Sequence, residues 1–203
     1  MIKALFAIVL GFQAVQAEQD FKHIYKANDS ITYNWSADAS ELGGGMVTGK
    51  LTEKVAKVEG EKVSLEWSIS DIENAPIELK TSLAGTCEKG LPDALEAGQD
   101  FEIFKIYTLA NLLPEKALAD GKPLEVNLKN DHLETKGKFT SMSADPKTQD
   151  VTVEGAFDIS TESFSNNYTV KSVFNATTHR LTKSEVVFDT NRGKITVKIE
   201  ASK

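Results

Sequence analysis

Alternation of apolar and polar residues with a period of two most constrains the fold of this chain. In the stretch SITYNWSAD, every second residue is apolar: Ile31, Tyr33, Trp35 and Ala37. The stretch KVSLEWSIS repeats the pattern with Val63, Leu65, Trp67 and Ile69. Such alternation is typical of a strand that buries one face. The preceding KVAKVEGE places Gly60 at a turn, so the two runs around Gly60 predict a β-hairpin.

The second half of the sequence predicts a series of short strands. Five alternating segments follow one another with turn residues between them: HLETKGKFTSMS, QDVTVEGAFDIS, NYTVKSVFNA, RLTKSEVVFD and GKITVKIEA. Strands at this spacing favour an antiparallel meander. In the middle, DFEIFKIYTLANLLPEKAL carries apolar residues largely three apart, which predicts a short helix that ends before Pro114. The fold class is therefore mainly β or α+β, with a curved antiparallel sheet or an incomplete β-barrel and one central helix.

The first seventeen residues, MIKALFAIVLGFQAVQA, have the pattern of a secretory signal peptide. Lys3 supplies the positive charge, a short apolar run follows, and Val15-Gln16-Ala17 fits a signal peptidase site. The apolar run is shorter than the roughly 20 residues that a membrane span needs; the alternative is a buried N-terminal helix. We expect cleavage near Ala17, a mature single β-rich domain over residues 18–203 without a transmembrane span, and a periplasmic or extracellular location.

Charge and cysteine content narrow the partners and the source. The formal net charge is −7, which disfavours nucleic acid and anionic membrane surfaces as partners. Cys87 is the only cysteine, so the chain has no internal disulfide, and an unpaired cysteine suits a protein of the bacterial envelope. Four Asn-x-Ser/Thr tripeptides start at Asn28, Asn34, Asn167 and Asn175. They matter only in a eukaryotic secretory pathway, and their modification is left open.

No segment of the sequence indicates a catalytic site. The stretch with the most potentially catalytic side chains is VFNATTHRLTKSEVVFD, and its pattern predicts a hairpin with Thr177 to Arg180 at the turn. We expect His179 to be exposed there and without an orienting partner. The three histidines, His23, His132 and His179, lie far apart and match no metal-binding pattern. The sequence therefore predicts no catalytic residue, no metal, no cofactor and no enzymatic activity.

A family resemblance accompanies this reading of the residues. The chain resembles a broad group of secreted bacterial β-rich proteins with no established activity, and the resemblance rests on the order ANDSITYNW, VEGEKVSLEWSI, LLPEKALADGKPLEV, VEGAFD and SVFNATTHRLTKSEV. This chain departs from the group pattern at Asn28, Pro123-Leu124, Asn175 and His179. The resemblance implies a curved sheet with a helical lid, in the periplasm or outside the cell. A more distant architectural likeness is to the open-barrel lipoprotein carriers of the bacterial envelope.

Three hypotheses of function follow from these observations. The first is a non-enzymatic binding or carrier module, because a curved sheet facing a helix can enclose an apolar cleft. The candidate lining residues are Tyr33, Trp35, Trp67, Phe101, Phe104, Leu112 and Leu113; the alternative is that they simply form the core. The second is a structural or interaction protein of the cell envelope without a small ligand, and the third is a hydrolase. The partner is accordingly an apolar ligand or an envelope protein.

Overall fold

The protein is described from a computed structural model, which covers residues 23–75, 81–88, 91–92, 102–114, 118, 122–129, 134–160, 165–190 and 192–202. The predicted signal segment 1–17, Phe101 and His132 lie outside these residues. The elements within them, in chain order, are β1 (Ser30–Asp38), η1 (Ser40–Leu42), β2 (Met46–Glu59), β3 (Lys62–Glu73), β4 (Ser82–Glu88), β5 (Leu91–Pro92), α1 (Glu102–Ala110), β6 (Leu124–Lys129), β7 (Glu134–Ala144), β8 (Val151–Ser160), β9 (Ser165–Phe174), β10 (Leu181–Thr190) and β11 (Gly193–Ala201). Among them no helix has the length and hydropathy that crossing a bilayer requires.

All the strands belong to one antiparallel sheet. Its order is β5-β4-β3-β2-β1-β11-β10-β9-β8-β7-β6, so the first and last strands of the chain lie side by side in the middle. The sheet ends at β5 and β6 and does not close into a barrel. This confirms the predicted mainly-β fold, including the hairpin around Gly60, where Glu59 pairs with Lys62.

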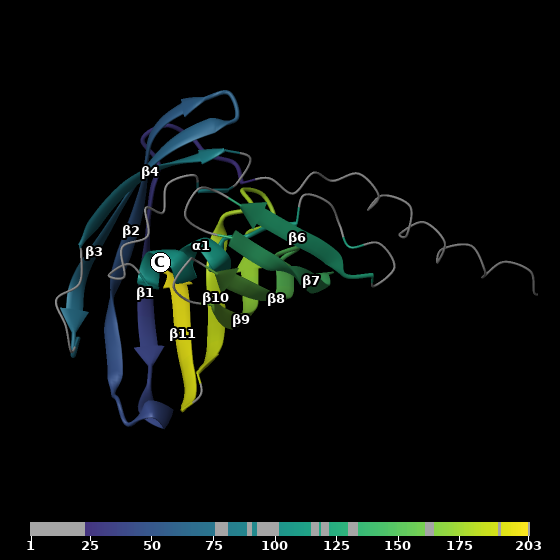
Figure 1. Cartoon of the computed structure of the whole chain (residues 1–203). Helices are drawn as coiled ribbons and strands as arrows, with labels where there is room; N and C mark the ends of the chain where they lie inside the picture. The colour runs from purple at the N-terminus through teal and green to yellow at the C-terminus, as the bar shows by residue number, and fades with distance from the viewer. Residues whose placement is uncertain are drawn as a thin grey trace, which may run out of the picture.

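The sheet is strongly curved, and α1 lies on its concave side (Figure 1). The helix is attached to β9 through Ser172, whose Oγ donates a hydrogen bond of 2.7 Å to the carbonyl of Ala110. All five residues from Ile103 to Tyr107 are at most 8% exposed. A helix with consecutive buried residues is covered all round, so α1 is a central helix rather than a surface helix with one apolar stripe.

Strand register separates an apolar concave face from a charged outer face. On the concave face Tyr33 lies opposite Leu51, which lies opposite Ile69, and all three are buried. On the outer face a row of alternating charges crosses four strands, in the order Glu154, Lys171, Glu185 and Lys198. Opposite charges directly across neighbouring strands stabilise that register. A slip of one residue would carry this charged row into the core.

Candidate functional site

The residues predicted to line a cleft lie together in the interior. Tyr33, Trp35 and Trp67 project from the concave face, and Phe104 and Leu112 belong to α1 and the segment just after it. Each of the five is at most 6% exposed, and Leu113 is half-buried against them. Both tryptophans face inward, as their alternation predicts. In this structure the described members of the set are part of the hydrophobic core.

A buried ion pair at the centre of this interior was not predicted from the sequence. Glu53 on β2 is 1% exposed, and Arg180, which immediately precedes β10, is 9% exposed. One carboxylate oxygen of Glu53 accepts a hydrogen bond from the Arg180 guanidinium. The other accepts hydrogen bonds from Trp67 Nε1 at 3.1 Å and from the Tyr107 hydroxyl at 3.0 Å. Removing charges from water is costly unless they are paired and hydrogen-bonded, and here the carboxylate has three donors.

The pair spans the concave side of the sheet. The strands β1 and β11 lie between β2 and β10, so Glu53 and Arg180 are separated by three strand spacings, about 14 Å along the sheet. Their side chains meet because the sheet curves toward itself. Tyr107 attaches α1 to the same carboxylate. The cluster therefore ties both halves of the sheet and the central helix to a single point.

Sequence alternation contained a signal for Glu53. It stands between Leu51 and Val55, both of which face the core, so the strand pattern alone places a carboxylate on the buried face. A charge at an inward position needs a partner of opposite charge. Which cation supplies it could not be read from the sequence, because Arg180 lies 127 residues away.

The two tyrosines beside Glu53 are neutral near pH 7. Burial, reinforced by the nearby Glu53 charge, raises the pKa of Tyr33 and that of Tyr107 well above the usual range of a phenol. Their rings lie 5.3 Å apart in a tilted arrangement. The Tyr107 phenol donates to the carboxylate, and neither ring adds a second negative charge to the interior.

The segment around His23 packs against this cluster. His23 lies between two carbonyls, with Nδ1 2.6 Å from the oxygen of His179 and Nε2 2.7 Å from the oxygen of Asn111. Ile24 N donates to the carbonyl of Thr178 at 3.0 Å, and the Tyr25 ring lies 4.7 Å below the Arg180 guanidinium. Burial lowers the pKa of His23 to about 4, so the ring is neutral near pH 7. A neutral imidazole donates through only one nitrogen.

The expectation that His179 is exposed and without a partner is wrong. The residue is 8% exposed, its backbone N donates to the carbonyl of Asn175 at 2.9 Å, and its own carbonyl contacts His23. It adopts φ of +51°, in the left-handed region. The physical reason is tertiary: the segment that begins at His23 packs over this turn and covers a residue that hairpin geometry alone would leave in solvent.

The stretch that holds His179 is nevertheless a hairpin turn, as predicted, and a second described turn has the same geometry. Asn175 Oδ1 accepts from the backbone N of Thr177 and Thr178, at 2.9 and 3.0 Å. In the turn between β7 and β8, Asp145 Oδ1 accepts in the same way from Lys147 and Thr148. The fifth residue of each turn, His179 or Gln149, has positive φ. The two turns share a backbone design, so the polar residues of this stretch serve the turn and the ion pair.

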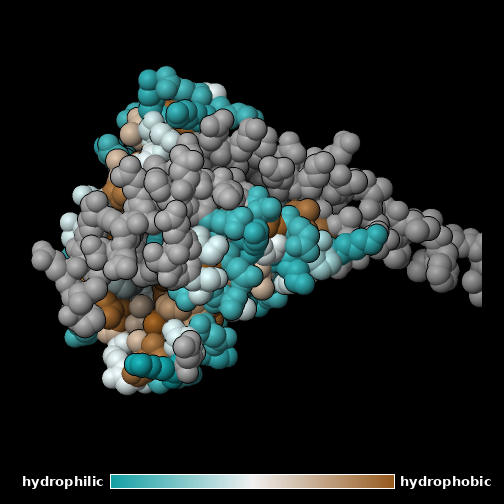
Figure 2. Space-filling model, viewed as in Figure 1, coloured by the Kyte–Doolittle hydropathy of each residue, from teal (hydrophilic) through white to brown (hydrophobic). Residues whose placement is uncertain are grey.

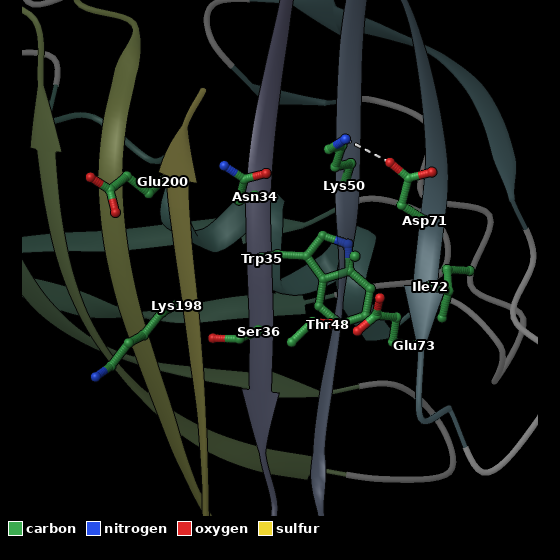
Figure 3. Close-up of a pocket in the computed structure, with 11 residues that line it drawn as sticks. Asn34, Trp35, Ser36, Thr48, Lys50, Asp71, Ile72, Glu73, Lys198 and Glu200 are labelled. Carbon is green, nitrogen blue, oxygen red and sulfur yellow. Dashed lines mark hydrogen bonds and ion pairs between the residues drawn. The ribbon is translucent and has the colours of Figure 1, made fainter. Parts of the chain in front are cut away.

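Two open grooves lie on the outer face of the sheet rather than in the interior. The larger, of about 840 Å³, is lined by Asn34, Trp35, Ser36, Thr48, Gly49, Lys50, Asp71, Ile72, Glu73, Lys198 and Glu200. Figure 3 shows Lys50 and Asp71 pointing toward each other across it, with Nζ 2.6 Å from Oδ2. The smaller groove, of about 460 Å³, lies beside Lys54 and Glu66. Each groove is lined by one of the predicted cleft residues, Trp35 or Trp67, but both grooves lie among the outer-face residues and not on the concave face.

The larger groove lies at an irregularity in the strand pairing. Thr48 pairs with Glu73 and Lys50 with Ser70, so Gly49 on β2 faces two residues of β3, Asp71 and Ile72. This is a β-bulge, and Asp71 takes φ of +51° within it. On the concave side of the sheet at this bulge, the Trp35 indole extends across β2 (Figure 3). A Cβ added at Gly49 would come within 2.8 Å of Trp35 Cζ2.

The concave face continues as apolar surface toward the hairpin that joins β1 and β2. The half-buried side chains there are Ala37, Val47, Phe188 and Ile195, and the exposed one beside them is Leu42. Figure 2 shows hydrophobic surface near the bottom of the view, above this hairpin. These five residues are called the apolar end below. Within the described residues no group of three or more His, Cys, Asp or Glu side chains is placed to hold a metal ion.

Comparison with known proteins gives a distant structural likeness. No protein-family model and no curated protein matches the sequence. A crystal structure of a protein from Bacteroides fragilis, inferred to be exported and described as having a YmcC-like fold, aligns with 91% of this chain and 100% of its own. The identity is 12% and the TM-score is 0.44. A likeness at this level carries no functional argument.

Proposed function

We propose that this chain is an exported, non-enzymatic protein of the bacterial envelope that binds an apolar ligand on the concave face of its sheet. The observation that carries the proposal is the apolar end, where the lining of the interior continues into accessible surface. Leu42 is 36% exposed there, next to the half-buried members of the apolar end. Contiguous apolar surface on a soluble domain marks a binding site more often than a scattered residue does.

Export is supported by the residues themselves. The charged, apolar and small-residue regions of segment 1–17 follow the order of a signal peptide. The non-enzymatic assignment is supported by how the interior polar groups are used. Glu53 and Arg180 hydrogen-bond each other, and the Trp67 and Tyr107 donors are directed at the same carboxylate. An acid-base or nucleophilic site would instead direct such groups at a common reacting atom.

A mass-spectrometric measurement of co-purifying lipid tests the proposal. The mature protein, isolated from the native host without denaturant, is expected to carry lipid in stoichiometric amount. Ile195→Glu places a charge at the apolar end and should abolish this lipid. Val187→Glu is the matched control, because Val187 is also half-buried but lies on the outer face of the neighbouring strand β10. A protein free of lipid, or equal loss in both variants, would contradict the proposal.

The second candidate is an interaction protein of the envelope without a small ligand. It is favoured by the filled interior, in which the described candidate lining residues pack against one another. It is also favoured by the position of β6 at the end of the sheet, where Leu124 is 37% exposed. An open strand edge can pair with a strand of another protein. Lipid-free protein that is captured by an envelope component through β6 would support this candidate.

A further inference from the structure

The strand β6 leaves one edge of the sheet open. It is the last strand in the sheet order, and it pairs with β7 over its whole length, Leu124–Lys129, without a register shift (Figure 1). Its other side pairs with no described strand. Natural edge strands are usually protected by a bulge, a proline or an inward-pointing charge. The described part of β6 has none of these, because the pairing is regular, Pro123 lies before the strand, and the described inward side chains are apolar.

Those inward side chains of β6 are covered only in part. Leu124 lies opposite Phe139, and Val126 lies opposite Gly137. Because directly opposite residues share a face and Phe139 is buried, Leu124 and Val126 belong to the concave face. Leu124 is nevertheless 37% exposed, and Val126 is half-buried. The apolar side chains of the concave face therefore continue to the edge, where a further strand would cover them.

The outer residues of β6 favour a second copy of β6 as that strand. Glu125 and Asn127 alternate with the inward residues and are exposed. Identical edge strands can pair antiparallel about a two-fold axis. The axis then passes through a residue rather than between two, because directly opposite residues share a face. The residue at the axis lies opposite its own copy.

The position of that axis follows from the side chains that it brings together. An axis at Val126 places each Glu125 carboxylate opposite Asn127 of the other copy, whose amide can donate to it. The two Val126 side chains then meet on the concave face. An axis at Glu125 would instead place two carboxylates directly opposite each other, which destabilises a sheet.

We infer that β6 pairs with β6 of a second copy of this chain, about a two-fold axis at Val126. The inference goes beyond the proposed function, since it concerns the sheet edge and not the apolar end. Each open edge satisfies the backbone N–H and C=O groups of the other, and the two concave faces join into one surface. Because a two-fold interface is closed, the dimer leaves no β6 edge for further strand addition.

Single cysteines in a Cys87→Ser background, which lacks the native thiol, test the position of the axis. A residue at the axis lies about 4.5–5.5 Å from its copy, Cα to Cα, which a disulfide can span. Apposed thiols have an effective concentration in the millimolar range, so Val126→Cys should cross-link at least about tenfold faster than Glu125→Cys or Asn127→Cys alone. The two control variants should cross-link to each other when they are mixed.

Sedimentation of the unmodified mature protein at micromolar concentration should show a dimer. Leu124→Lys adds an inward charge at the edge and should give a monomer. Met46→Lys is the matched control and should stay dimeric, because Met46 is also an exposed apolar residue but lies on β2, in the other half of the sheet. Circular dichroism checks that both variants fold.

Three results would overturn the inference. They are a monomeric unmodified protein, equal effects of Leu124→Lys and Met46→Lys on the dimer, and cross-linking that is no faster at Val126→Cys than at the control positions. A monomer that pairs through β6 with a different protein belongs to the first of these. None of the three alters the lipid measurement, so the proposed function is tested separately.

Discussion

Replacing Arg180 by Met tests whether the buried ion pair is a structural link across the curved sheet. The substitution keeps most of the side-chain volume and removes the charge. It leaves Glu53, at 1% exposure, with two neutral donors and no cation. Removing one partner of a buried pair costs about 3–5 kcal/mol, because the remaining charge is uncompensated. That loss is a large part of the roughly 5–15 kcal/mol by which a domain is stable.

Urea denaturation followed by tryptophan fluorescence measures this loss. Adding Glu53→Gln to Arg180→Met removes the stranded charge and should restore at least about 2 kcal/mol, so the two changes are not additive. Lys198→Met is the matched control: its ion pair with Glu185, at 3.7 Å, is exposed, and its loss should cost less than about 1 kcal/mol. A loss below about 1 kcal/mol for Arg180→Met, or strict additivity in the double variant, would refute the reasoning.

Three further perturbations follow from the structure. His23 has a folded-state pKa of about 4, below its ordinary value of 6.5, so the unfolded chain binds the proton first. The free energy of unfolding should be highest above pH 6.5 and should fall by up to roughly 2–3 kcal/mol as the pH drops toward 4. Urea denaturation at several pH values measures this fall. If the His23→Gln variant shows the same fall, another group is responsible for it. Gly137→Ala should destabilise the protein by at least about 2 kcal/mol, because the new Cβ would lie 2.2 Å from the Ala156 carbonyl oxygen. Gly45→Ala is the control, because a Cβ there meets nothing within 4 Å and the change should be nearly neutral. Similar melting temperatures for the two variants would disprove the close approach at Gly137. Trp35 and Trp67, each 4% exposed, should both resist iodide quenching, and Trp67→Ala should cost about 3–5 kcal/mol; free access of iodide at either site would be inconsistent with an inward-facing indole.

Local pattern was sufficient to predict the strands and the side of the sheet on which most side chains lie. The alternation through Tyr33 and Trp35 determines which residues are buried, because successive side chains of a strand point to opposite faces. The threefold spacing after Phe101 predicted a helix before Pro114, and α1 occupies Glu102–Ala110. These features depend on neighbours in the chain, so they could be read from short stretches.

Only the tertiary structure decided the curvature of the sheet and the contacts that cross it. Arg180 and His179 lie in a turn whose local sequence indicates exposure, yet both are buried. Their surroundings come from three distant segments, which contribute His23, Glu53 and Tyr107. The inward position of Glu53 on β2 follows from the sequence by itself, whereas its partner depends on how far the strands between β2 and β10 curve. That curvature is the sum of twists and bulges over several strands, which no single stretch of sequence encodes.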